Sequence, residues 1–226
     1  MNKTQLFAWL LVLVSALVFV AFVLFKNTKI PNSIGYLILY SVTLLVIFNL
    51  KLTPSEIGLS RQAILGGLRV AAPFVVAIII SGLSLYFFKK DIFLDSRYKQ
   101  TLADMIIKVL VILPITVVII EELIFRGFLM AILAQLFDLR FATIVSSLLF
   151  GLWHVYSAGG IKADSLHLPF TVPRVVISVL VILATSMAGL FFAWLRIKSD
   201  GIFASILVHW SLNATGVVLA FLAWKK

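Results

Sequence analysis

Residues 121–127 read Glu-Glu-Leu-Ile-Phe-Arg-Gly and follow an apolar run from Ile106 to Ile120. The run holds one charged residue, Lys108. A carboxylate or guanidinium at the centre of a membrane helix costs roughly 2.5–3.5 kcal/mol on insertion scales, so such groups are generally paired, turned toward the protein interior and functional. The stretch therefore predicts a membrane helix with a polar centre.

The spacing of the three charges assigns them different partners. Glu122 and Arg126 stand four residues apart, with the acid on the N-terminal side, which is the favourable order for an ion pair on one helix face. Glu121 is turned from Glu122 by about 100° and has no cation at that spacing. We predict a structural ion pair between Glu122 and Arg126, and Glu121 is a candidate general base.

The composition identifies an integral membrane protein. Of 226 residues, 62% are hydrophobic and 12% are charged, whereas a soluble domain carries about 25% charged residues. The net charge of +10 is expected in loops that face anionic lipid. No basic run is longer than two residues, which argues against a nucleic-acid partner. The chain has no cysteine, which excludes disulfides, a thiol nucleophile and cysteine metal ligands.

The apolar runs predict an all-α fold, a polytopic membrane helix bundle of about seven transmembrane helices. The predicted spans are Leu6–Phe25, Ser33–Leu50, Ile64–Phe88, Ala103–Ile124, Phe141–Tyr156, Pro173–Arg196 and Ile202–Trp224. We expect a single membrane-embedded domain over residues 1–226. Within it, residues 1–100 supply N-terminal helices and residues 101–226 form the core that carries the polar motifs.

Further polar residues occur in the last three predicted helices. Phe150 and His154 lie late in the fifth helix, and His209 and Asn213 share one face of the seventh. Taken singly, a buried histidine is more often a structural hydrogen bonder, and the pair on the seventh helix could join two helices. Taken together with Glu121, they supply a base, imidazoles and hydrogen-bond donors for an oxyanion.

The motifs EExxxR, FxxxH and HxxxN, in this order, resemble those of the CPBP (Abi) family of intramembrane endopeptidases, to which the eukaryotic CAAX prenyl protease belongs. The resemblance covers about Leu113 to Gly216. It implies a membrane-embedded hydrolase in which Glu121 and His154 activate water. It further implies that His209 and Asn213 bind the oxyanion. The expected structural support of the site comes from Glu122, Arg126 and Phe150.

Other intramembrane protease chemistries lack their motifs in this sequence, which has no HExxH, GxSG or GxGD. A carboxylate with two histidines is a legitimate zinc ligand set, so a metal-dependent site would use Glu121, His154 and His209. Because the two histidines lie on different helices without a short ligand spacing, we favour a glutamate mechanism that requires no cofactor. A divalent metal such as zinc stays an open alternative.

The leading functional hypothesis is an endopeptidase that cuts a peptide bond in or near the membrane. Its expected partners are membrane lipid and a membrane-associated protein or peptide substrate, and its expected location is a bacterial plasma membrane that it crosses several times. One alternative is a membrane immunity or scaffold protein of the same family that acts by binding a partner. Another is a transporter or proton relay, although the sequence shows no internal repeat.

The hydrolase hypothesis sets a geometric condition on the fourth and fifth helices. If the fourth helix ended at Ile124 and the fifth crossed the membrane fully, Glu121 and His154 would lie near opposite membrane faces. We therefore expect the fourth helix to continue past Arg126 and the fifth to be short or tilted. The candidate catalytic side chains are then predicted to converge on one cavity that water can enter.

Overall fold

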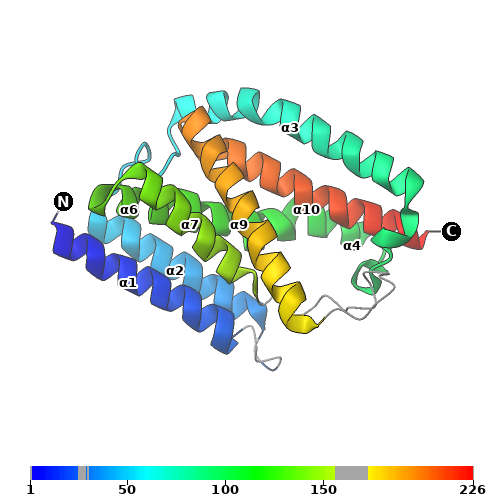
Figure 1. Ribbon diagram of the computed structural model, residues 1–226, viewed down its shortest axis with the longest axis horizontal. Coiled ribbons are helices and arrows are strands. Elements are labelled where there is room, and N and C mark those ends of the chain that lie inside the picture. The colour runs from blue at the N-terminus through cyan, green and yellow to red at the C-terminus, as the bar shows by residue number, and fades with distance from the viewer. Residues whose placement is uncertain (1, 25–28, 30, 156–172, 226) are drawn as a thin grey trace.

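All regular structure in the described parts of the chain is helical (Figure 1). The computed structural model describes residues 2–24, 29, 31–155 and 173–225. Six described helical segments are long and apolar enough to cross a membrane, and a seventh, Leu139–Trp153, is shorter. The predicted all-α membrane bundle is therefore confirmed.

The N-terminal half consists of three long helices. They are α1 (Lys3–Phe19), which continues as the π-helical turn η1 (Val20–Leu24), α2 (Asn32–Leu50) and α3 (Arg61–Phe88). Figure 1 shows α1 and α2 side by side, and α3 following α10 (Phe203–Trp224) along its length. Two short 3-10 turns, η2 (Lys90–Phe93) and η3 (Ser96–Tyr98), lead from α3 to the fourth span.

The fourth span is one continuous helical segment of 35 residues, Leu102–Leu136. Its parts are α4 (Leu102–Ile107), η4 (Lys108–Ile112), η5 (Pro114–Val118), α5 (Ile119–Glu122), η6 (Leu123–Leu129) and α6 (Met130–Leu136). The predicted end at Ile124 was wrong, because the apolar residues that follow Gly127 continue the helix to Leu136. The expectation that this helix passes Arg126 is confirmed, and Glu121 lies in its middle.

The fifth span, α7 (Leu139–Trp153), is 15 residues long. The Asp138 side chain caps its first turn by accepting a hydrogen bond from the Phe141 backbone N–H at 2.8 Å. The helix therefore begins two residues before the predicted start, and Tyr156, its predicted end, lies outside the described residues. A helix of this length rises by roughly 22 Å, less than the ~30 Å hydrocarbon core, so the expected short fifth helix is confirmed.

The last two helices, α9 (Arg174–Ser199) and α10, agree with the predicted spans within three residues. Small side chains let α9 approach α7 closely, since a Cβ added at Gly189 would come within 3.0 Å of the Ser147 Cα. Helix α10 packs on both α3 and α9. The fourth span, α7, α9 and α10 thereby surround the polar centre.

Two side chains satisfy carbonyls of the π-helical segment η6. A π-helical turn offers its carbonyls less regular partners than an α-helix, and such turns often occur at functional sites. The Ser146 hydroxyl donates to the Phe125 carbonyl at 2.7 Å, and the Arg196 Nε donates to the Arg126 carbonyl. The Arg196 Nη2 also donates to the Glu56 carbonyl at 2.9 Å, which ties the segment before α3 to the polar centre.

Candidate active site

Glu122 and Arg126 form the predicted ion pair. The Arg126 Nη1 lies 3.1 Å from the Glu122 Oε1, and neither side chain is exposed. The guanidinium lies over the ring of Phe150, 4.0 Å from its centroid, and its Nη2 donates to the Gly189 carbonyl at 3.3 Å. A buried pair of this kind contributes mainly by keeping each charge compensated, because removing one partner leaves the other unpaired.

His209 on α10 is the third member of this buried group. Its Nδ1 lies 2.9 Å from the Glu122 Oε1, and its ring stacks on that of Phe192 with the centroids 5.0 Å apart. An ionised carboxylate can only accept, so the Nδ1 carries the proton and donates it. The other ring nitrogen of His209, the Nε2, lies 3.9 Å from the Glu121 Oε2.

His154 approaches Glu121 from the end of α7. Its Nδ1 lies 2.7 Å from the Phe150 carbonyl oxygen, which can only accept, so the Nδ1 again carries the proton. Its Nε2 lies 3.9 Å from the Glu121 Oε2, and a fifth of its side chain is exposed. In the neutral ring this Nε2 presents a lone pair to Glu121.

The two carboxylate oxygens of Glu121 have different surroundings. The Oε1 accepts a hydrogen bond from the Trp153 Nε1 at 2.9 Å. The Oε2 is buried, has no hydrogen-bond partner in the described part of the chain, and lies 3.9 Å from the Nε2 of both His154 and His209. A water molecule with hydrogen bonds of about 2.8 Å fits between the Glu121 Oε2 and either imidazole Nε2, because water can donate to two acceptors at once.

The structure brings Glu121, His154 and His209 together, and it shows no hydrogen bond from Asn213 to any of the three among the described contacts. Asn213 lies one helical turn beyond His209 on α10 and is partly buried. Its side chain lines a hollow of about 280 Å³ together with Asp95 and other residues that follow α3.

The residue types at the site are ones that bind zinc, but the distances between their donor atoms are longer than those between the ligands of a zinc ion. Zinc bonds of 2.0–2.1 Å in a tetrahedral arrangement place neighbouring ligand atoms roughly 3.3 Å apart. The Glu121 Oε2 lies 3.9 Å from each imidazole Nε2, which is wider than that. Among the described residues, no group of three His, Asp or Glu side chains is close enough to hold a metal ion.

Sequence reasoning missed two residues that contact the polar centre, Trp153 and Arg196. A buried tryptophan needs a hydrogen-bond partner for its indole N–H, so a tryptophan directly before His154 was the available signal for the first. Arg196 lies in the last turn of α9, and its two backbone acceptors come from distant parts of the chain. No spacing pattern in the sequence predicts that contact.

Comparison with known families finds a match over the half of the chain that contains this site. The family model of the type II CAAX prenyl endopeptidases, described as Rce1-like, matches residues 103–215. No curated protein and no solved structure matches the chain. The matched range begins at the fourth span and ends just beyond Asn213, so it includes Glu121, Trp153, His154 and His209.

Proposed function

The chain belongs to the Rce1-like family of type II CAAX prenyl endopeptidases, and from this premise we propose that it hydrolyses a peptide bond of a membrane-associated protein or peptide substrate. It is a multi-pass integral membrane protein of a protease family. The proposed reaction takes place at Glu121, within the membrane-embedded core and in contact with membrane lipid.

One observation carries the proposal, the buried Glu121 Oε2 that faces two imidazole nitrogens at 3.9 Å each. A carboxylate oxygen left without a donor inside a membrane protein is costly unless a water or a substrate group occupies the gap. Glu122 is already paired with Arg126, so Glu121 is the carboxylate that can accept a proton. General-base chemistry requires this arrangement.

The proposed reaction begins with a water molecule held between Glu121 and His154. The Glu121 Oε2 accepts one proton from the water, and the resulting hydroxide attacks the carbonyl carbon of the scissile peptide bond. The proton then passes through the His154 Nε2 to the leaving nitrogen as the C–N bond breaks. Glu121 returns to its ionised form when its proton passes to the leaving nitrogen. The products are an amine and a carboxylic acid, and the acid then loses its own proton to solvent.

The tetrahedral oxyanion needs donors opposite the attacking water. His209 is proposed to supply one through an Nε2–H, which requires the ring to carry a second proton while its Nδ1 stays bonded to Glu122. Asn213 is proposed as a second donor through its side-chain amide. Its place one turn along α10, at the edge of a hollow, would let a bound substrate lie between it and Glu121. The wide donor spacing favours this route without zinc.

A cleavage assay tests the proposal. Purified protein in phospholipid vesicles is incubated with a library of internally quenched peptides that have apolar flanks, and the products are identified by mass spectrometry. Cleavage by the wild type that is lost in Glu121→Gln supports the endopeptidase. A well-folded wild type that cleaves no peptide would favour the alternative, an immunity or scaffold protein of the same family that acts by partner binding.

A further inference from the structure

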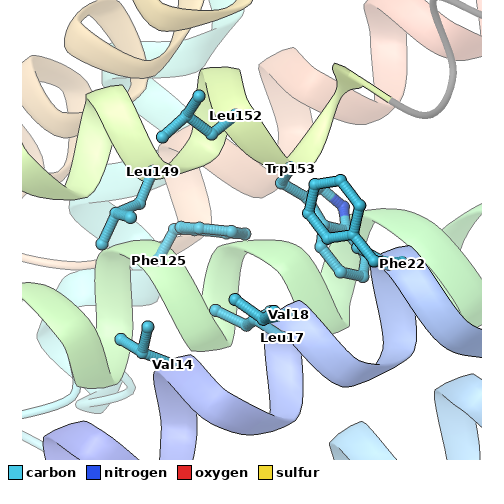
Figure 2. Close-up of a pocket in the computed structure, with 9 residues that line it drawn as sticks. Val14, Leu17, Val18, Phe22, Phe125, Leu149, Leu152 and Trp153 are labelled. Carbon is cyan, nitrogen blue, oxygen red and sulfur yellow. The ribbon is translucent and has the colours of Figure 1, made fainter.

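The indole of Trp153 contacts both Glu121 and a separate apolar pocket. Its Nε1 donates to the Glu121 Oε1 at 2.9 Å. Figure 2 shows its ring at the end of α7, facing Phe22 of the first helical segment. The pocket has a volume of about 150 Å³, and Phe125 and Leu149 also line it. The polar edge of the ring therefore meets the polar centre, while its body lies among apolar side chains.

This hydrogen bond distinguishes the two oxygens of Glu121. A carboxylate on a three-bond side chain can rotate about its last torsion, which has a broad energy minimum. Holding the Oε1 at one donor removes that freedom and leaves the Oε2 directed at His154 and His209. A hydrogen bond to a charged acceptor is worth about 1.5–3 kcal/mol, enough to favour one orientation strongly.

We propose that Trp153 is a positioning residue for Glu121, whose indole N–H holds the carboxylate in the orientation that presents the Oε2 to the water. The inference rests on the function proposed above. A purely structural role would instead depend on the bulk of the ring, which packs near Phe125 and Phe22. The hydrogen bond and the bulk can be removed separately, and the two roles then predict opposite results.

Two substitutions separate donor from bulk. Trp153→Phe keeps an aromatic ring in the pocket and removes the N–H. Trp153→His removes the benzene ring but keeps a donor in place, because the Nε2 of histidine and the Nε1 of tryptophan are each two bonds from Cγ. Both replacement side chains are smaller than tryptophan, so each fits within the space that the indole fills beside the pocket.

Trp210→Phe is the matched control. The Trp210 Nε1 donates to the Val109 carbonyl at 2.9 Å, so this substitution removes an indole hydrogen bond of the same length from the residue beside His209. It leaves Glu121 and its partners in place. With the best-cleaved library peptide as the probe, Trp210→Phe is expected to keep the wild-type kcat and pH profile.

The positioning role predicts a specific pattern in the kinetics. Trp153→Phe should lower kcat roughly 10- to 100-fold, with KM unchanged. Trp153→His, assayed above pH 8 where its new imidazole is neutral, should retain more activity than Trp153→Phe. Equal activities of Trp153→Phe and Trp210→Phe, or a Trp153→His less active than Trp153→Phe, would overturn the inference.

A second measurement needs no turnover. The chain has five tryptophans, so ¹⁵N-labelled indoles give few resonances, and the one absent from Trp153→Phe belongs to Trp153. That resonance should shift strongly in Glu121→Gln, whereas the Trp210 resonance should stay in place. An unmoved Trp153 resonance would overturn the inference even if the protein cleaved peptides. A shifted resonance in a protein that cleaves none would retain the contact and reject the proposed function.

Discussion

Glu121 and Glu122 are neighbours on one helix, yet Glu122 forms an ion pair and Glu121 accepts only a neutral hydrogen bond among the described contacts. We therefore expect a structural role for Glu122 and a chemical role for Glu121. Glu122 is unexposed, and its Oε1 bonds both Arg126 and His209, while the Arg126 guanidinium packs against the rings of Phe150 and Phe192. Each carboxylate has one oxygen without a hydrogen-bond partner in the described part of the chain. Glu122 has a cation bonded to its other oxygen, whereas the unpartnered oxygen of Glu121 faces two imidazole nitrogens at 3.9 Å.

The two carboxylates differ in whether a bonded cation compensates their negative charge. The positive charge of Arg126 balances Glu122 in the absence of substrate, and the ion pair with its carbonyl and aromatic contacts holds the fourth span against α7 and α9. Around Glu121, the described contacts supply one neutral donor and no direct cation. A carboxylate without a cation partner is costly inside a membrane, and this is the arrangement that the proposed general base would have before water and substrate bind.

The most severe test removes the basic oxygen. Glu121→Gln keeps the size of the side chain, so its effect should fall on turnover and leave folding intact. Loss of a general base is expected to lower kcat by about 10²- to 10⁴-fold. Peptide cleavage measures this, and gel filtration with thermal unfolding in detergent checks the fold. A Glu121→Gln protein that unfolds while Glu122→Gln stays folded would reverse the roles assigned to the two carboxylates.

Substitutions in the ion pair should have the opposite effect. Arg126→Ala leaves Glu122 as an uncompensated buried charge, which is expected to destabilise the protein by about 3–5 kcal/mol. Glu122→Gln should also reduce the yield of folded protein and, because Glu122 orients His209, slow the reaction in what remains folded. Yield from detergent extracts and the thermal midpoint measure both effects. Arg126→Ala with wild-type stability would contradict the structural role.

Asn213 lies outside the resting contacts of both carboxylates, so its contribution should appear only in the reaction. If it is one oxyanion donor, Asn213→Ala should lower kcat by about 10²- to 10³-fold with little change in KM or stability. Leu212→Ala, at the neighbouring position beside the same hollow, is the control and should keep kcat. An Asn213→Ala variant that loses only substrate affinity would place Asn213 in binding instead.

Glu56 offers a mild comparison, since it is an exposed carboxylate outside the spans. Hydrogen bonds from the backbone N–H and the hydroxyl of Thr53 hold the pKa of Glu56 below its ordinary value. Its contribution to stability is therefore present above the pKa of the unfolded chain and is lost as pH falls through the lower folded pKa. Glu56→Gln should cost about 0.5 kcal/mol at pH 7. Thermal unfolding should show this difference vanish in acid, and a difference that grows in acid would contradict it.

Chelation should have the smallest effect. With the donors around Glu121 spaced too widely for zinc, exhaustive dialysis against a chelator should leave the cleavage rate of the wild type unchanged. The measurement is the rate before and after dialysis, and again after zinc is added. A loss that zinc restores would make Glu121, His154 and His209 metal ligands and remove the contrast drawn between the two carboxylates.

Contacts along one helix could be predicted from the sequence, because helical geometry converts spacing into proximity. The Glu122–Arg126 pair follows from four-residue spacing, and the argument that Glu121 and His154 must meet predicted both the long fourth span and the short α7. The convergence of His154 and His209 on Glu121 matches that argument. The span drawn from the apolar run ends at Ile124, and only the condition that Glu121 meets His154 predicts that the helix continues past Arg126.

The individual hydrogen-bond partners between helices cannot be predicted from the sequence, because they depend on how each helix is rotated about its own axis. Nothing in the spacing indicates that the Nδ1 of His209 is bonded to Glu122, or that Trp153 donates to Glu121. Asn213 lines a hollow, and among the described contacts no hydrogen bond joins it to the other site residues. The sequence does not predict this position either. One sequence without aligned relatives carries no signal about such rotations.

The 35-residue length of Leu102–Leu136 couples the polar centre to the thickness of the bilayer. A helix of this length measures roughly 52 Å, against a hydrocarbon core of ~30 Å. Such a mismatch is accommodated by tilt, by projection from the membrane or by local deformation of the lipid. Each of these changes the depth of Glu121, which lies near the middle of the segment. We therefore expect the depth of Glu121 in the bilayer, and with it the path of water to the carboxylate, to depend on the acyl-chain length of the surrounding lipids.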